Sequence, residues 1–205
     1  MIVSVIIPYK KDRGYLQQAI DSVHAQTYPD VELILSQSDN YVGYNINRGI
    51  EKATGEFIRY LCDDDMLQPR SIEHQVKAMA DYDFIHGNAV HFFPGNKKIY
   101  HVPRVQKPVL KDMYEGNCIH GGSVMYRKSS FDKYGYFDES LWTGEEFDLH
   151  LKWLSEGARM GYVQKEVYLY RRHAEQKSIG VQTREYHLER VQAINIIRNK
   201  YRCKL

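Results

Sequence analysis

The stretch Phe57-Ile58-Arg59-Tyr60-Leu61-Cys62-Asp63-Asp64-Asp65 joins an aromatic and β-branched run to three consecutive carboxylates. Such a run favours a β-strand, so a strand over 57–61 is predicted to end at the acids. Three adjacent carboxylates repel one another unless a cation neutralises them. Clustered oxygen ligands suit Mg²⁺ or Mn²⁺, ions that bridge carboxylates to nucleotide phosphates. A solvated acidic turn is the alternative interpretation.

Alternating strand and helix patterns surround this stretch. They predict a strand at 3–7, a helix from 16 to near 28, a strand at 31–35, a helix at 45–53 with Gly55 as its C-terminal cap, and a helix opening at 69–71 and reaching Ala80. This order predicts an α/β fold with an open, mostly parallel sheet and helices on both faces. Ligands bind beyond the carboxyl ends of such strands, so residues 9–13, 36–40 and 63–65 are expected to converge. Residues 88–111 are expected to form an irregular excursion.

Composition narrows the class of protein. With 205 residues and a net charge of +2, the chain is expected to form one domain, or one domain with a tail, that does not bind nucleic acid. Three cysteines without CxxC spacing argue against a disulfide framework and a zinc site, and favour a reducing compartment. The apolar start ends early at Pro8, which predicts a strand and no signal peptide. We therefore expect a cytoplasmic protein.

Several segments together resemble a known family. They are Ser4-Val5-Ile6-Ile7-Pro8-Tyr9, Ala25-Gln26-Thr27-Tyr28, Asn45 to Ile50, the Asp triplet, Gly122 to Arg127, Gly135 to Glu139, Glu145 to Leu149, and Tyr170-Arg171-Arg172-His173. In this order and spacing they resemble the large inverting glycosyltransferase family with the GT-A fold, family 2. The resemblance spans roughly residues 3 to 175. It implies transfer of a sugar from a nucleotide-diphosphate sugar to a hydroxyl of a glycan or lipid-linked glycan acceptor, as in polysaccharide biosynthesis.

The resemblance implies a divalent metal cofactor, Mn²⁺ or Mg²⁺, at the Asp triplet. Matched residue by residue, Asp63 faces the ribose and nucleotide, Asp64 is the metal ligand, and Asp65 joins through water. Cys62 stands where the family often has Asp, so the division of these tasks among the carboxylates stays open. His173 falls where some members supply a further metal ligand, with a purely structural histidine as the alternative.

Inversion requires one carboxylate base to take the acceptor's proton. The resemblance assigns this role to Glu146, with Glu145 as the second candidate. Both acids also suit a helix N-terminus, since apolar residues follow at helical spacing. A rigidly placed base at the start of a helix is consistent with both interpretations.

Nucleotide recognition departs from the family pattern. The family usually has an Asp pair after the second strand, one of which bonds uracil, whereas this chain has Gln37, Ser38 and a shifted Asp39. UDP remains the expected nucleotide on family grounds. The further candidates for nucleotide contact are Pro8, Tyr9, Arg13 and Asn47, together with Asp63.

Two other classes of protein match the sequence less well. A sugar nucleotidylyltransferase needs a Gly-rich basic loop after the first strand, and Pro8 to Asp12 is no such loop. A catalytically inactive nucleotide-sugar-binding module would be expected to lose the Asp triplet or the Glu pair.

The predicted domains are 1–180, the GT-A domain, and 181–205, an amphipathic helix. This helix either packs on the domain, touches a membrane surface, or links to a further module.

Overall fold

The computed structural model describes residues 1–93, 97–103, 105–174, 176 and 184–205. Its first half contains β1 (Val3–Tyr9), α1 (Leu16–His24), β2 (Val31–Gln37), α2 (Val42–Lys52), β3 (Phe57–Tyr60), β4 (Met66–Leu67) and α3 (Ser71–Met79). Its second half contains β5 (Phe84–Phe92), β6 (Lys98–His101), α4 (Leu110–Glu115), the 3-10 turn η1 (Gly121–Ser123), β7 (Met125–Arg127), α5 (Lys128–Tyr134), α6 (Glu145–Ser155), β8 (Met160–Arg171), α7 (Arg184–Lys200) and a short 3-10 turn, η2 (Arg202–Lys204).

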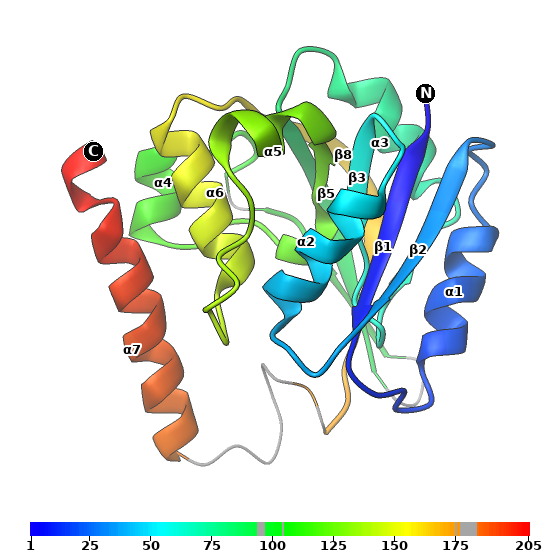
Figure 1. Ribbon diagram of the computed structural model, residues 1–205, viewed down its shortest axis with the longest axis horizontal. Coiled ribbons are helices and arrows are strands. Elements are labelled where there is room, and N and C mark those ends of the chain that lie inside the picture. Colours follow the sequence, from blue (N-terminus) through cyan, green and yellow to red (C-terminus); the bar gives the residue numbers. More distant parts are fainter. Residues whose placement is uncertain (94–96, 104, 175, 177–183) are drawn as a thin grey trace.

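One twisted sheet forms the centre of the molecule, with helices on both faces (Figure 1). The strand order is β2-β1-β3-β7-β5-β8-β4, and β6 pairs with β5. The pairings β1–β2, β1–β3 and β5–β8 are parallel, and the other pairings in the described chain are antiparallel. The parallel order predicted for the first three strands is therefore confirmed, and the second half of the sheet is mixed.

Strand alternation divides the core into two layers, because successive side chains point to opposite faces of a sheet. In β1, Val5 and Ile7 pack with α1 and α3, whereas Ile6 packs against α2. Each of these three side chains is fully buried. Burying an aliphatic side chain of this size contributes about 1.5–3 kcal/mol, which explains why the apolar run of β1 forms the centre of the fold.

Two local predictions are wrong. Gly55 does not cap α2, because the helix ends at Lys52 and Ala53 is extended. Instead Gly55 lies against β1, where an added Cβ would meet the Ser4 Oγ at 2.6 Å. The predicted excursion at 88–111 contains regular structure, since β5 continues to Phe92 and β6 returns beside it as a hairpin. Residues 94–96 and 104 of that stretch lie outside the described residues, as does the predicted domain boundary at 180.

The smaller differences concern helix ends. Helix α2 begins at Val42, three residues before the predicted start, and α3 ends one residue short of Ala80.

Helix α7 runs along the edge of the domain beside α6 (Figure 1). Its Ile197 is fully buried, while Leu188 and Val191 of the same helix remain exposed.

Candidate active site

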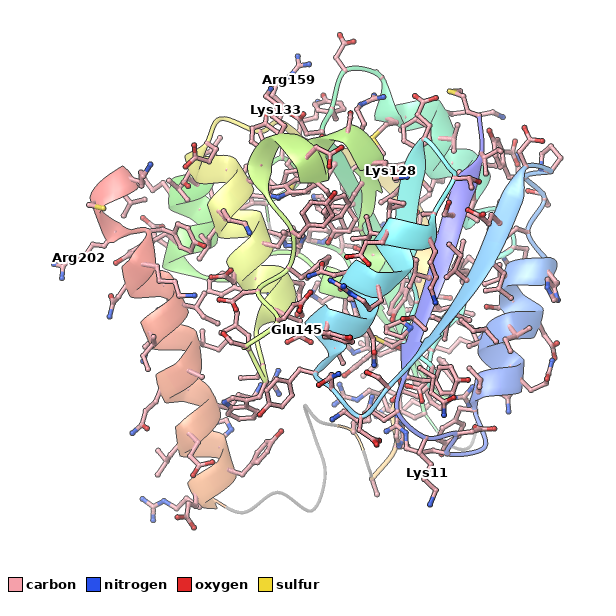
Figure 2. The ribbon with its side chains drawn as sticks, in the orientation of Figure 1. Lys11, Lys128, Lys133, Glu145, Arg159 and Arg202 are labelled. Carbon is pink, nitrogen blue, oxygen red and sulfur yellow. The ribbon has the colours of Figure 1, made fainter. Side chains whose placement is uncertain are left out.

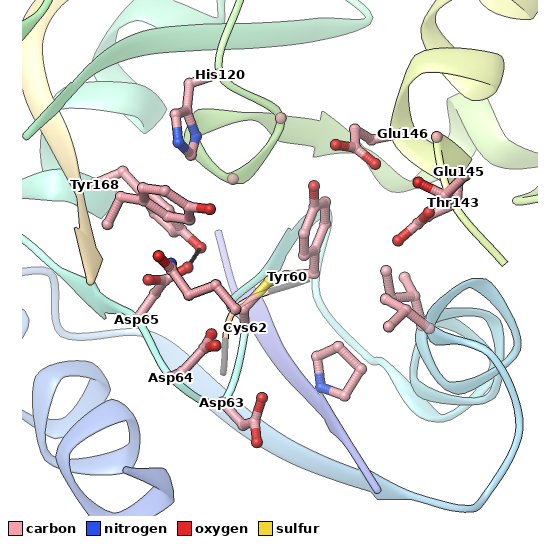
Figure 3. Close-up of a pocket in the computed structure, with 18 of the residues that line it drawn as sticks. Tyr60, Cys62, Asp63, Asp64, Asp65, His120, Thr143, Glu145, Glu146 and Tyr168 are labelled. Carbon is pink, nitrogen blue, oxygen red and sulfur yellow. Dashed lines mark hydrogen bonds between the residues drawn. The ribbon is translucent and has the colours of Figure 1, made fainter. Parts of the chain in front are cut away.

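A cavity of about 660 Å³ opens beyond the carboxyl ends of β1 and β3 (Figure 3). This is the edge at which an open α/β sheet binds its ligands. The residues that line it are Pro8, Lys10, Lys11, Arg13, Val42, Ile46, Tyr60, Cys62, Asp63, Asp64, Asp65, Asn117, Ile119, His120, Gly121, Gly122, Thr143, Gly144, Glu145, Glu146, Tyr168, Tyr170, Gln176 and Arg190. In Figure 2, Lys11 projects outward past the end of β1, and Glu145 lies at the start of α6. The volume falls in the range that holds a small-molecule ligand.

The Asp triplet begins three residues after the end of β3 and lines one wall of the cavity. The Arg13 guanidinium lies 3.0 Å from the Asp63 Oδ1 and 2.9 Å from the Asp64 Oδ2. Burial raises the pKa of the Asp63 carboxyl, while the charge of Arg13 acts in the opposite direction. Arg13 therefore neutralises part of the negative charge that the three acids concentrate here.

Asp65 is buried, whereas Asp63 and Asp64 are only partly buried. It is 1% exposed and accepts hydrogen bonds from the Tyr168 hydroxyl at 2.5 Å and from the Arg171 backbone N–H at 2.7 Å. Burial, followed by the nearby charge of Asp64, raises the pKa of Asp65 well above its ordinary value. Asp65 thus joins the turn after β3 to β8.

The donor set around Asp64 fits a divalent cation. The His173 Nε2 lies 3.0 Å from the Asp64 Oδ2, and the histidine side chain is 8% exposed. The ligand atoms of Cys62, Asp64 and Asp65 also lie within 4.8 Å of one another. Oxygen and imidazole ligands are compatible with Mn²⁺ or Mg²⁺, so the residues present fit the expected metal.

The Glu pair lies on the opposite wall, at the first two positions of α6. Gly144 precedes it with φ +75°, a left-handed conformation that favours glycine and turns the chain into the helix. Carboxylates are stabilised in the first turn of a helix. The Glu146 side chain packs closely against η1, since a Cβ added at Gly121 would lie 2.5 Å from its Cγ.

Helix α7 supports this wall from behind. An added Cβ at Gly144 would meet the Ile194 Cδ1 at 2.6 Å. Further along α6, Asp148 accepts hydrogen bonds from the Tyr201 hydroxyl at 3.0 Å and from the Lys200 Nζ at 3.1 Å. These contacts join α6 to the C-terminal end of α7 and to the residue that follows it.

The predicted base-recognition residues lie beside the cavity and are absent from its described lining. The Tyr9 hydroxyl donates to the Gln37 Oε1 at 3.3 Å, and the Gln37 amide donates to the Lys10 carbonyl. The Ser38 hydroxyl donates to the Asn45 side chain at 2.5 Å, whereas Asp39 is exposed. These contacts hold the loop after β2 against the end of β1.

Asn47 does not reach the cavity. Asn47 is 4% exposed. Its side-chain amide nitrogen donates hydrogen bonds to the Phe137 carbonyl and to the Glu139 carboxylate, each at 2.9 Å, and its side-chain oxygen accepts one from the Phe137 backbone N–H. All of these partners belong to the loop that leads to α6. Asn47 therefore joins α2 to that loop, and Pro8, Arg13 and Asp63 are the predicted nucleotide residues that line the cavity.

Several lining residues have no counterpart in the sequence predictions. Tyr60, His120, Gly121, Thr143 and Tyr168 reach the cavity from four different segments of the chain. The signal for Tyr60 was present, because it follows buried Ile58 on the same face of β3 and lies three residues before Asp63. The others depend on contacts between distant segments, such as the close approach of Gly122 to the Tyr168 ring.

Comparison with known proteins bears on this arrangement. The sequence profile described as "Glycosyl transferase family 2" matches residues 36–135. Uncharacterized glycosyltransferases of Rickettsia typhi and Rickettsia conorii are 28% and 30% identical over 189 and 187 residues, or 75% and 74% of this chain. The chain therefore resembles glycosyl transferase family 2, as its motifs predict. It spans 58% and 31% of the lengths of these two relatives.

Solved structures support the fold. The crystal structure of S. aureus TarS residues 1–349 in complex with UDP-GlcNAc has a TM-score of 0.72 over 96% of this chain and 65% of that chain, at 16% identity. The same TarS fragment in complex with UDP has a TM-score of 0.69. The predicted GT-A fold is therefore confirmed. Among the helices of the described residues, none is both long and apolar enough to cross a bilayer.

Proposed function

We propose that this family 2 domain transfers a sugar from a UDP-sugar to a hydroxyl of a glycan or lipid-linked glycan. The observation that carries the proposal is that Asp63 and Asp64 and the pair Glu145 and Glu146 line opposite walls of one cavity. A displacement at the anomeric carbon needs these two functions on opposite sides, one for the leaving diphosphate and one for the attacking hydroxyl.

On the acceptor side, Glu146 takes the proton of the attacking hydroxyl. Its packing against Gly121 limits where its carboxylate can lie, which suits a group that must meet one oxygen. Glu145 precedes it by one position and is the second candidate for the base. A single in-line displacement with one base inverts the anomeric configuration.

On the donor side, Arg13 binds the diphosphate and Asp63 faces the ribose of the nucleotide. Asp64 and His173 would hold Mn²⁺ or Mg²⁺, with Asp65 behind them fixing the turn on β8. When bound, such an ion neutralises charge that develops on the leaving diphosphate. The structure of TarS with UDP-GlcNAc supports the choice of a UDP-sugar for this chain.

The acceptor class is supported by one characterised relative. The GalNAc(5)-diNAcBac-PP-undecaprenol beta-1,3-glucosyltransferase of Campylobacter jejuni is 28% identical over 123 residues, 46% of this chain and 40% of that protein. By its name that enzyme acts on a glycan carried on a lipid diphosphate. A peripheral membrane contact through α7, whose Leu188 and Val191 are exposed, is consistent with such an acceptor.

The deciding experiment measures UDP release from UDP-glucose, UDP-galactose and UDP-GlcNAc with Mn²⁺ and with EDTA, using wild type and Asp64→Ala. Release that needs the metal and is lost in a folded Asp64→Ala protein is expected. UDP binding with no release or transfer to any supplied glycan would favour the inactive binding module. Release of pyrophosphate from a nucleoside triphosphate and a sugar phosphate would favour the nucleotidylyltransferase.

A further inference from the structure

Tyr60 occupies a fixed place in the floor of the cavity. It is the last residue of β3 and is 5% exposed. Its ring stacks on Tyr126 at 6.4 Å between centroids and meets Phe137 edge-on at 6.1 Å. Aromatic contacts of this kind fix the ring plane, so the position of the hydroxyl is determined by the core beneath it.

The hydroxyl of Tyr60 differs from those of the neighbouring buried tyrosines. The Tyr126 hydroxyl bonds the His150 Nε2 at 2.8 Å, and the Tyr168 hydroxyl donates to Asp65 at 2.5 Å. No hydrogen bond among the described residues reaches the Tyr60 hydroxyl, and the residue lines the cavity. A phenol at a largely buried position usually has a polar partner, so a group that enters the cavity is the natural partner here.

The hydroxyl also points to a particular side of the site. Figure 3 shows the Tyr60 ring rising between the Asp triplet and the Glu pair, with its oxygen directed to the side of Glu146. Burial first, and then the Glu146 carboxylate, raises the pKa of Tyr60 well above its ordinary value. The phenol is therefore protonated at neutral pH and can donate as well as accept a hydrogen bond.

The reaction fixes what must lie above this oxygen. With the diphosphate at Asp64 and the attacking hydroxyl at Glu146, the anomeric carbon and its sugar ring lie between them. We propose that Tyr60 binds the transferred sugar directly and helps to select it, through a hydrogen bond between its phenol and one sugar hydroxyl. This inference rests on the proposed function. It concerns the sugar alone, because the UDP moiety lies on the Arg13 side of the cavity.

Tyr60→Phe removes one oxygen and keeps the ring packing. Calorimetry with Mn²⁺ is expected to give an unchanged Kd for UDP and a roughly 3- to 10-fold weaker Kd for the preferred UDP-sugar, the scale of one neutral hydrogen bond. Tyr126→Phe is the matched control, since it removes a buried phenol oxygen from the stacked neighbour. Its affinities for UDP and for the UDP-sugar are expected to match the wild type in the folded protein.

Analogues of the preferred UDP-sugar that lack single hydroxyls identify the partner. Wild type is expected to lose affinity for one deoxy analogue, whereas Tyr60→Phe binds that analogue and the parent sugar equally. Equal weakening of UDP and UDP-sugar, or no change in either, would overturn the inference while leaving the proposed function intact. Failure of wild type to bind UDP and every UDP-sugar would instead overturn the proposed function and this inference with it.

Discussion

Replacing Gly121 by alanine tests whether Glu146 is the base and whether the turn η1 positions it. The added Cβ would lie 2.5 Å from the Cγ, 2.9 Å from the Oε1 and 3.0 Å from the Cδ of Glu146. Ordinary carbon contacts are about 3.5–4.0 Å, so the glutamate side chain must move by roughly 1 Å. A displacement of that size in a reacting group lowers a rate by about 100-fold.

The effect should fall on turnover and leave donor binding intact. The atoms that must move belong to one flexible side chain on the acceptor wall, and the Asp triplet lies on the other wall. We therefore expect kcat for UDP release with acceptor to fall about 100-fold, with the Kd for UDP by calorimetry unchanged. Thermal unfolding of the variant checks that the protein is folded.

Gly116→Ala provides the matched control. Gly116 has an extended backbone with φ 179°, and an added Cβ there meets nothing within 4 Å. Its turnover should equal that of the wild type. Wild-type turnover in a folded Gly121→Ala protein would refute the placement of the base, and a parallel loss of UDP affinity would refute the separation of the two walls.

Glu146→Gln is expected to lower kcat by roughly 10²–10⁴-fold with UDP affinity retained, because the amide cannot take the acceptor's proton, and NMR of the product should show an inverted anomer. Normal turnover in this variant together with an inactive Glu145→Gln variant would assign the role of base to Glu145. In calorimetry with Mn²⁺, UDP is expected to bind more tightly than GDP; a tenfold preference for GDP, about 1.4 kcal/mol, would contradict the choice of uridine. Burial lowers the pKa of His86 from 6.5 to about 4, so protonating this histidine destabilises the fold. Its contribution to the free energy of unfolding is complete above pH 6.5 and is lost as pH falls toward 4. In urea unfolding, the free energy of unfolding of the wild type at pH 5 should be lower by about 2 kcal/mol because of His86, and His86→Gln should not show this decrease. An unchanged pH dependence in the variant would contradict the assignment.

The first half of the fold was predictable because its signals are local. An unbroken apolar run is sufficient for β1, and helical spacing of apolar residues is sufficient for α1 and α3. The second half depends on pairing over long sequence distances. β5 extends to Phe92 because β8 pairs with it along its whole length, from Phe84 with Met160 to Phe92 with Arg171. Nothing within residues 88–92 alone specifies that partner.

The site divides in the same way. The Asp triplet was found because clustered carboxylates are unusual at the end of a strand. The Glu pair was found through its resemblance to the family motif. Asn47 shows the limit of motif matching, because a polar residue on the helix near the cavity proved to be saturated by the backbone of residue 137 and by Glu139. Tyr60 shows the converse, since a residue that reads as core places its one polar atom in the cavity.

If the proposed cation binds at this site, the contact of Arg13 with Asp63 and Asp64 makes its uptake an exchange of counter-ions. The guanidinium already balances the two carboxylates, so an incoming ion that takes Asp64 displaces a partner with the same sign of charge. The free energy of ion binding is then the difference between the ion's interaction with Asp64 and the interaction of Arg13 that it replaces. The ion therefore binds more weakly than it would to an unpaired aspartate. The displaced guanidinium is exposed enough to move, and its positive charge is then left without a carboxylate partner at the mouth of the cavity. An anionic diphosphate satisfies that charge, so ion and donor are expected to bind with mutual assistance.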